Sequence, residues 1–85
     1  MDENEKRVEA VLFAVGKEIT SERIACLCSM EVKQVEETIG ALISQYAQRN
    51  NSLQIVKKEN GWKLTVRAEF VPLVSSLVSN TELER

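Results

Sequence analysis

A single apolar stripe along residues 32–48 constrains the fold of this chain more than any other feature of its sequence. The apolar side chains recur every three or four positions and fall within an arc of about 100° on a helical wheel, which predicts one long amphipathic helix. Such a helix is stable only when other elements cover its apolar face. The stripe consists of Val32, Val35, Ile39, Leu42, Ile43 and Tyr46.

Two shorter apolar patterns precede the long helix. The first predicts a helix near residues 5–15 and the second a helix near residues 21–28. A short extended piece at Ile19 separates them, and Thr20 or Ser21 is suited to cap the second helix. Two short helices followed by a longer one, with a tight turn before the last, is the order of a helix-turn-helix.

Residues 53–67 predict a β-hairpin whose turn is Asn60-Gly61, a dipeptide that suits a two-residue type I′ turn. Pairing outward from Glu59 opposite Trp62 gives the hairpin one apolar and one polar face. The apolar face carries Leu53, Ile55, Trp62, Leu64 and Val66, and the polar face carries Gln54, Lys58, Lys63, Thr65 and Arg67. A hairpin after the long helix is the wing of a winged helix-turn-helix, so the fold class is α+β.

A fourth helix is expected near residues 69–78, with Pro72 in its first turn. No linker or shift in composition divides the chain, so residues 1–85 are expected to form one winged-helix domain. A chain of 85 residues that is 44% hydrophobic buries only a modest core. Association with a partner that binds the folded form would add to its stability.

The stretch from Phe70 to Thr81 contains no charged residue and predicts a protein interface. Val71 and Val78 widen the apolar stripe of the fourth helix beyond what one contact with a small core requires. Phe13 lies on the side of the first helix away from its core positions, and is either ordinary core or part of the same interface. The interface is expected to comprise Phe13, Phe70, Val71, Val74, Leu77 and Val78.

Catalytic and metal chemistry find little support in the composition. The chain has no histidine, and its only aspartate, Asp2, lies at a terminus that we expect to be frayed. Cys26 and Cys28 are two apart on a helix, so they are expected to be free buried thiols and not a disulfide or half of a zinc site. We expect a non-enzymatic protein without a cofactor or a small-molecule substrate.

The charged side chains indicate the cellular compartment of the protein and the kinds of partner that it binds. Eleven basic and thirteen acidic side chains give a net charge of -2, which disfavours direct binding to nucleic acid. An acidic N-terminus and the lack of a long apolar run indicate a cytoplasmic chain with no membrane segment.

A helix-turn-helix nevertheless makes a DNA-binding transcriptional regulator the alternative reading. The long helix offers Lys33 beside Glu36 and Glu37, whereas the wing is the most basic element. Lysines on an edge hairpin also protect against aggregation. This alternative predicts a DNA affinity that falls steeply with salt. Its contacts would be Lys33, Lys58, Lys63 and Arg67.

Trp62, on the apolar face of the hairpin, is expected either to cap the core or to anchor a partner.

Three stretches stand out in order and spacing: VEAVLFAVGKEIT at 8–20, LQIV at 53–56 and GWKLTVRAEF at 61–70, together with Tyr46 at the end of the long helix. They resemble the N-terminal winged-helix domain of segregation and condensation protein B, the accessory subunit of prokaryotic condensin complexes. The chain departs from the family pattern at Glu18, where proline is common, and at Ser29, where glycine is common. Family members also usually carry a second winged helix.

The resemblance implies a non-enzymatic protein that forms homodimers, chiefly through this domain. It also implies binding to the kleisin subunit of a condensin-type complex and, through the kleisin, association with the condensin ATPase. The role would then be chromosome condensation and segregation at the nucleoid. Because the kleisin contacts of a second domain cannot be carried over to this chain, dimerisation is the central expectation.

Overall fold

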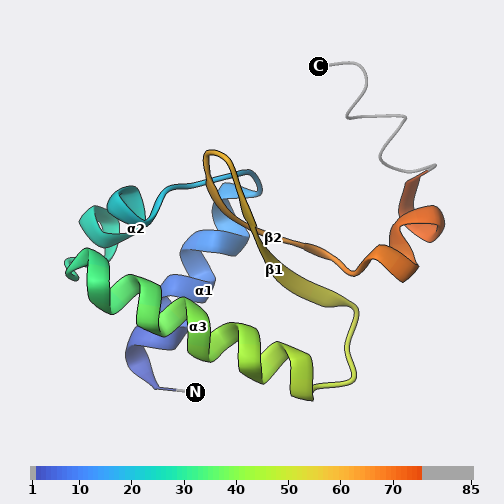
Figure 1. Ribbon diagram of the computed structural model, residues 1–85, viewed down its shortest axis with the longest axis horizontal. Helices are drawn as coiled ribbons and strands as arrows, with labels where there is room; N and C mark the ends of the chain where they lie inside the picture. The colour runs from blue at the N-terminus through green and yellow to red at the C-terminus, as the bar shows by residue number, and fades with distance from the viewer. Residues whose placement is uncertain (1, 76–85) are drawn as a thin grey trace.

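The computed structural model describes residues 2–75, which form three helices followed by a β-hairpin and the start of a further helix (Figure 1). The predicted winged helix-turn-helix is confirmed. The elements are α1 (Glu3–Val15), α2 (Ser21–Cys28), α3 (Val32–Gln48), β1 (Leu53–Lys58), β2 (Gly61–Val66) and the 3-10 turn η1 (Ala68–Phe70). Residues 71–75 continue as α-helix, and the last three positions of the fourth helix predicted at 69–78 lie outside the described residues.

The start of α1 differs from the prediction because Asp2 caps the helix. Its side-chain Oδ1 accepts a hydrogen bond from the backbone N–H of Glu5 at 2.8 Å, and Glu5 Oε1 accepts one from the backbone N–H of Asp2 at 3.0 Å. This reciprocal pair is a capping box, which satisfies two helix-end donors at once. The expectation of a frayed terminus at Asp2 is therefore wrong, and α1 begins two residues earlier than predicted.

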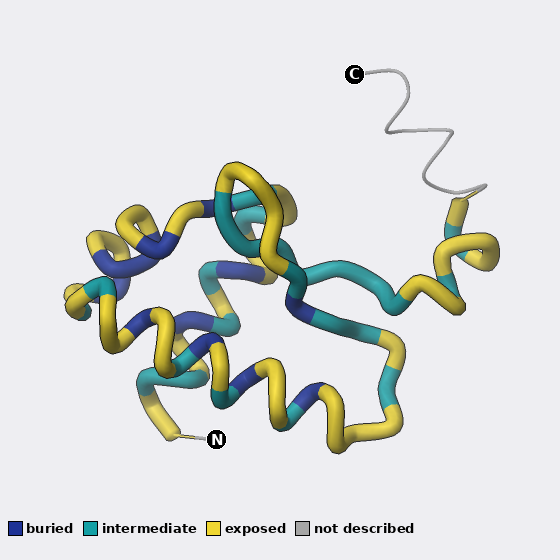
Figure 2. Tube along the Cα trace, in the orientation of Figure 1, coloured by how far each residue is buried: buried dark blue, intermediate teal, exposed yellow. Residues whose placement is uncertain are grey.

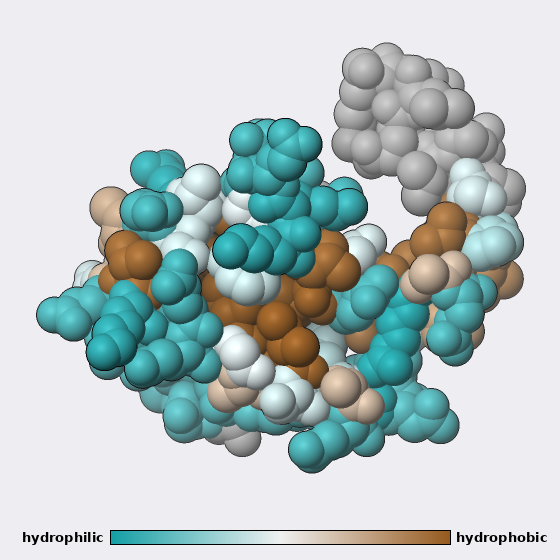
Figure 3. Space-filling model, viewed as in Figure 1, coloured by the Kyte–Doolittle hydropathy of each residue, from teal (hydrophilic) through white to brown (hydrophobic). Residues whose placement is uncertain are grey.

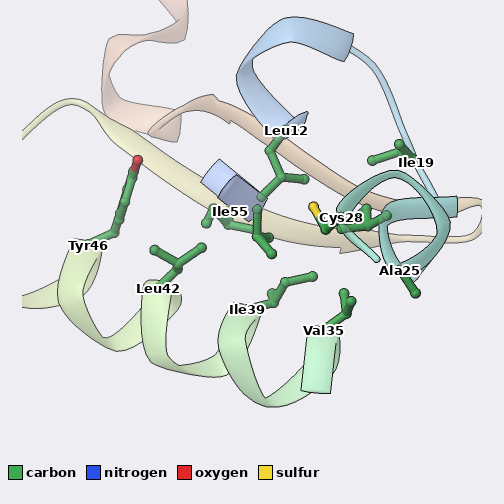
Figure 4. Packing of buried hydrophobic residues seen from close by; sticks show 11 residues of the cluster. Leu12, Ile19, Ala25, Cys28, Val35, Ile39, Leu42, Tyr46 and Ile55 are labelled. Atoms are coloured by element: carbon green, nitrogen blue, oxygen red, sulfur yellow. The ribbon is translucent and has the colours of Figure 1, made fainter. Parts of the chain in front are cut away.

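The core lies where the three helices meet the inner face of the hairpin (Figure 4). The stripe of α3 forms one side of the core, as predicted. Val32 at its start is half-buried, and Ile43 at its edge exposes 36% of its area. Buried positions recur along the inward sides of α1, α2 and α3 (Figure 2). The fully buried side chains are Val8, Leu12, Ile24, Cys28, Val35, Ile39 and Leu42.

The two cysteines differ in burial, although both were expected to be buried. Both are free, Cys28 in the core and Cys26 exposed on α2. Positions two apart on a helix point about 200° away from each other, so only one of the two faces the core.

The hairpin register differs from the prediction by two positions, although its faces are as predicted. Lys58 pairs with Gly61, so Glu59 and Asn60 form the turn. Gly61 is a strand residue with φ of 126°, and a Cβ atom there would lie 2.1 Å from the carbonyl oxygen of Ile19. A glycine is required for this close approach, which the Asn-Gly turn signal alone does not reveal. A slip of two keeps each side chain on the same face.

Candidate protein interaction surface

The C-terminal segment, defined here as residues 68–75, leaves the body of the domain after β2 (Figure 1). None of its residues is buried (Figure 2). Val71 exposes 47% of its area and Leu73 exposes 73%. Brown apolar atoms gather over this segment in the space-filling view (Figure 3). A helix start whose apolar side chains face solvent is an unusual surface for an isolated subunit and indicates an interaction site.

The structure describes three of the remaining predicted interface residues and leaves two outside the described range. Phe70 and Val74 are half-buried. Phe13 exposes 75% of its area, so it is not part of the core of a single subunit. Leu77 and Val78 lie outside the described residues. The structure thus leaves Phe13 and the C-terminal segment both exposed, on separate elements of the fold.

Phe13 lines a shallow groove between α1 and the hairpin, with a volume of about 300 Å³. We call it the α1–hairpin groove. Sequence reasoning placed Leu53 and Leu64 on the inner face of the hairpin and did not connect them with Phe13. The spacing of Lys6, Ala10 and Phe13 along one side of α1 is the signal that could have indicated a second face on this helix. The groove is lined by Lys6, Glu9, Ala10, Phe13, Tyr46, Leu53 and Leu64.

A second groove, of about 380 Å³, runs between α3 and β1 and has a more polar lining. The start of the C-terminal segment forms one of its walls. Its lining residues are Ile43, Tyr46, Ala47, Gln54, Ile55, Arg67, Ala68 and Glu69. We call it the α3–β1 groove.

Tyr46 contributes to both grooves and connects α3 with α1. Its hydroxyl donates a hydrogen bond to Glu9 Oε2. Burial raises the pKa of Tyr46 to about 12, and the hydrogen bond and the negative charge of Glu9 act in the same direction. Arg49, whose guanidinium carbon lies 5.7 Å from the centre of the ring, opposes the shift.

Arg67 fastens the end of the hairpin to the C-terminus of α3. Its Nε donates to the carbonyl of Leu53 at 3.0 Å, and its Nη2 donates to the carbonyls of Tyr46 and, at 3.1 Å, of Arg49. Nη2 also lies 3.2 Å from Oδ1 of Asn51. These bonds use Nε and Nη2 within the domain and hold the guanidinium against the C-terminus of α3, which favours a structural role for Arg67 over a phosphate contact.

The other cations of the DNA-binding alternative lie on two elements, Lys33 on α3 and both Lys58 and Lys63 on the polar face of the hairpin. Lys33 is exposed at the start of α3, where the outer surface also carries exposed Glu36 and Glu37. Lys58 is exposed near the tip of the hairpin, and Lys63 is half-buried. No observation among residues 2–75 therefore favours a groove-reading helix over a solvated surface.

Trp62 lies against the core and takes part in three contacts. Its backbone exchanges hydrogen bonds of 3.0 and 2.7 Å with Ile19, and its Nε1 donates to Ser21 Oγ at 2.9 Å. The Lys57 ammonium lies 5.6 Å from the centre of its ring. These contacts hold the wing against the start of α2, which is the role of a core cap.

The described part of the chain holds no group of three or more His, Cys, Asp or Glu side chains that could bind a metal ion. None of its helices is both long and apolar enough to pass through a bilayer.

The model of the family described as "Segregation and condensation complex subunit ScpB" matches residues 6–85. The chain belongs to the ScpB family. The resemblance seen in the sequence is confirmed.

Curated members of the ScpB family are longer than this chain. It is 25% identical over 73 residues to segregation and condensation protein B of Clostridioides difficile (strain 630), covering 84% of the chain and 41% of the relative. It is 26% identical over 76 residues to the protein of the same name from Desulforamulus reducens, covering 89% of the chain and 42% of the relative. The chain thus spans about two-fifths of the length of these relatives.

Solved ScpB structures share the fold. ScpB from Mycobacterium tuberculosis aligns with a TM-score of 0.81 at 22% identity, covering 94% of this chain and 51% of that one. A dimer of an ScpB N-terminal domain complexed with an ScpA peptide aligns with a TM-score of 0.76 at 22% identity. That alignment covers 85% of this chain and 84% of the other, so the match is to the N-terminal domain nearly as a whole.

Proposed function

We propose that this chain is a non-enzymatic dimerisation domain of a condensin-type complex that acts in chromosome condensation and segregation. The observation that carries the proposal is the exposed apolar C-terminal segment of an ScpB-family winged helix. A similar N-terminal domain has been solved as a dimer with an ScpA peptide, which supports dimerisation and binding of a partner peptide.

Both the exposed apolar area and the lack of charge in the C-terminal segment favour dimerisation. Val71 and Leu73 expose apolar area. Burial of such area in an interface stabilises the complex by about 25 cal/mol for each Å² removed from water. The chain carries no charged side chain from Phe70 to Thr81, and interface cores are depleted in charge. A second copy would therefore bury this surface without stranding an ionised group.

The partners we propose are a second copy of this chain and the kleisin subunit of a condensin-type complex, with the condensin ATPase reached through the kleisin. The family membership supports this assignment. The protein would act in the cytoplasm, at the nucleoid, without touching nucleic acid directly. Its net charge of -2 and the internal bonds of Arg67 are consistent with that role.

Dimerisation is tested by placing charge on the exposed segment. The double variant Val71→Glu, Leu73→Glu should keep its fold, because both side chains face solvent in the single subunit. We expect its dimer dissociation constant to rise at least about 100-fold, because burying each carboxylate costs more than about 1.4 kcal/mol. Sedimentation velocity over a dilution series measures the change.

Leu27→Glu is the matched control, since Leu27 is also an exposed leucine on a helix, with 51% of its area accessible. It should dimerise like the wild type. A wild-type chain that stays monomeric at high concentration would refute the proposal, as would a double variant that dimerises unchanged.

A further inference from the structure

The α1–hairpin groove has the properties of a receptor for an uncharged helix. Four of its seven lining residues are apolar, Ala10 and Phe13 from α1 and Leu53 and Leu64 from the hairpin. Its two charged residues, Lys6 and Glu9, have opposite signs, and Glu9 already accepts a hydrogen bond from Tyr46. An uncharged apolar segment would bring no further charge into the groove, and the exposed Lys6 can keep its ammonium group in water at the edge.

The same chain supplies a segment of this kind. Residues 70–75 are uncharged, and Val71 and Leu73 are the most exposed large apolar side chains among residues 68–75. The segment and the groove are the two places where the described chain leaves large apolar side chains most open to solvent, since Phe13 and Leu73 expose 75% and 73% of their areas.

The segment does not fill the groove of its own subunit. No residue of 67–75 lines the α1–hairpin groove, whereas Arg67, Ala68 and Glu69 line the α3–β1 groove. The hydrogen bonds of Arg67 to the carbonyls of Leu53 and Arg49 fix the point at which the segment departs, beside the C-terminus of α3. From there it runs away from the body (Figure 1).

We propose that the dimer forms by exchange, with the C-terminal segment of each subunit seated in the α1–hairpin groove of the other. This inference rests on the proposed dimerisation and adds which surfaces meet. Because each subunit offers one segment and one groove, a two-fold axis makes both contacts equivalent and closes the assembly at two subunits. Phe13 of one subunit then packs near Leu73 of the other, and neither residue meets its own counterpart.

Cross-linking of single-cysteine chains tests this pairing. The two chains are Phe13→Cys and Leu73→Cys, each also carrying Cys26→Ser to remove the exposed native thiol. They are mixed at a concentration where the wild type is dimeric and treated with a short bismaleimide. We expect the mixture to yield at least tenfold more cross-linked dimer than either chain alone, because a heterodimer brings the two different positions together and keeps its second docking contact intact.

The native chain provides a matched control. Cys26 is an exposed thiol on α2 outside the groove, so wild type mixed with the Leu73→Cys, Cys26→Ser chain should give no such excess. If each single-cysteine chain links to itself as readily as the mixture does, like positions meet and the exchange is wrong. If the wild type is dimeric but the mixture gives no excess of cross-linked dimer, the exchange is wrong and the proposed dimerisation stands. If the wild type is monomeric, both the exchange and the proposed function are wrong.

Discussion

At the scale of single residues, the hydrogen bond from Tyr46 to Glu9 joins α3 to α1 beside the proposed docking groove. Tyr46→Phe removes the donor and leaves a carboxylate that the open groove still exposes to water. We expect the free energy of unfolding to fall by about 1 kcal/mol, at the modest end for a bond to a charged group. Urea denaturation of the two proteins at neutral pH measures the difference.

The contact between Tyr46 and Glu9 makes the free energy of unfolding depend on pH in the alkaline range. The pKa of Tyr46 is raised from its ordinary 10.0 to about 12, chiefly by burial, so the fold favours the protonated phenol. Its contribution is complete below pH 10.0 and is lost as the pH rises through about 12. Wild type should lose more stability than Tyr46→Phe across that window.

Tyr46 is the only tyrosine, so ultraviolet absorbance of the tyrosinate follows its ionisation directly. Titration of the folded wild type at the ordinary value of 10.0 would contradict the buried contact.

At the scale of elements, Gly61 lets the hairpin approach the strand-like residue Ile19. Gly61→Ala would place a Cβ atom 2.1 Å from the carbonyl oxygen of Ile19, at a φ of 126° that side chains rarely adopt. We expect a loss of about 3 kcal/mol or more in the free energy of unfolding, because backbone and not a flexible side chain must move. Thermal and urea unfolding measure it.

Gly40→Ala is the matched control for that substitution. Gly40 lies inside α3, and an added Cβ atom there meets nothing within 4 Å. The alanine should raise stability by about 0.5–1 kcal/mol through its helix propensity. A Gly61→Ala variant as stable as the wild type would show that the hairpin and Ile19 are not held this closely.

The elements also show what the sequence could and could not predict. The stripe of α3 and the two faces of the hairpin follow from local periodicity, which is why Ile39 and Ile55 were placed correctly. The hairpin register was missed because it depends on the contact between Gly61 and Ile19, residues far apart in sequence. The capping box of Asp2 and Glu5 is a local signal, but it lies in polar residues that apolar periodicity does not register.

At the scale of the whole molecule, the interaction surface was predictable only in part. The uncharged stretch after Glu69 pointed to Val71 as exposed, and the structure places it at the surface. The α1–hairpin groove was not predictable, because Phe13, Leu53 and Leu64 come from three elements and meet only after folding. A receptor surface assembled from distant residues has no sequence period of its own.

Association and folding should be coupled in so small a molecule. If the dimer is the stable form, unfolding releases two chains, and a tenfold rise in protein concentration stabilises the folded dimer by about 1.4 kcal/mol. Because the dimer unfolds as two chains of 85 residues each, this raises the melting temperature by about 3–5 °C per decade of concentration. The Val71→Glu, Leu73→Glu variant should melt lower and at a temperature independent of concentration, because its folded state is a monomer. Differential scanning calorimetry at several concentrations distinguishes the two, and equal concentration dependence in both proteins would show that the C-terminal segment does not hold the subunits together.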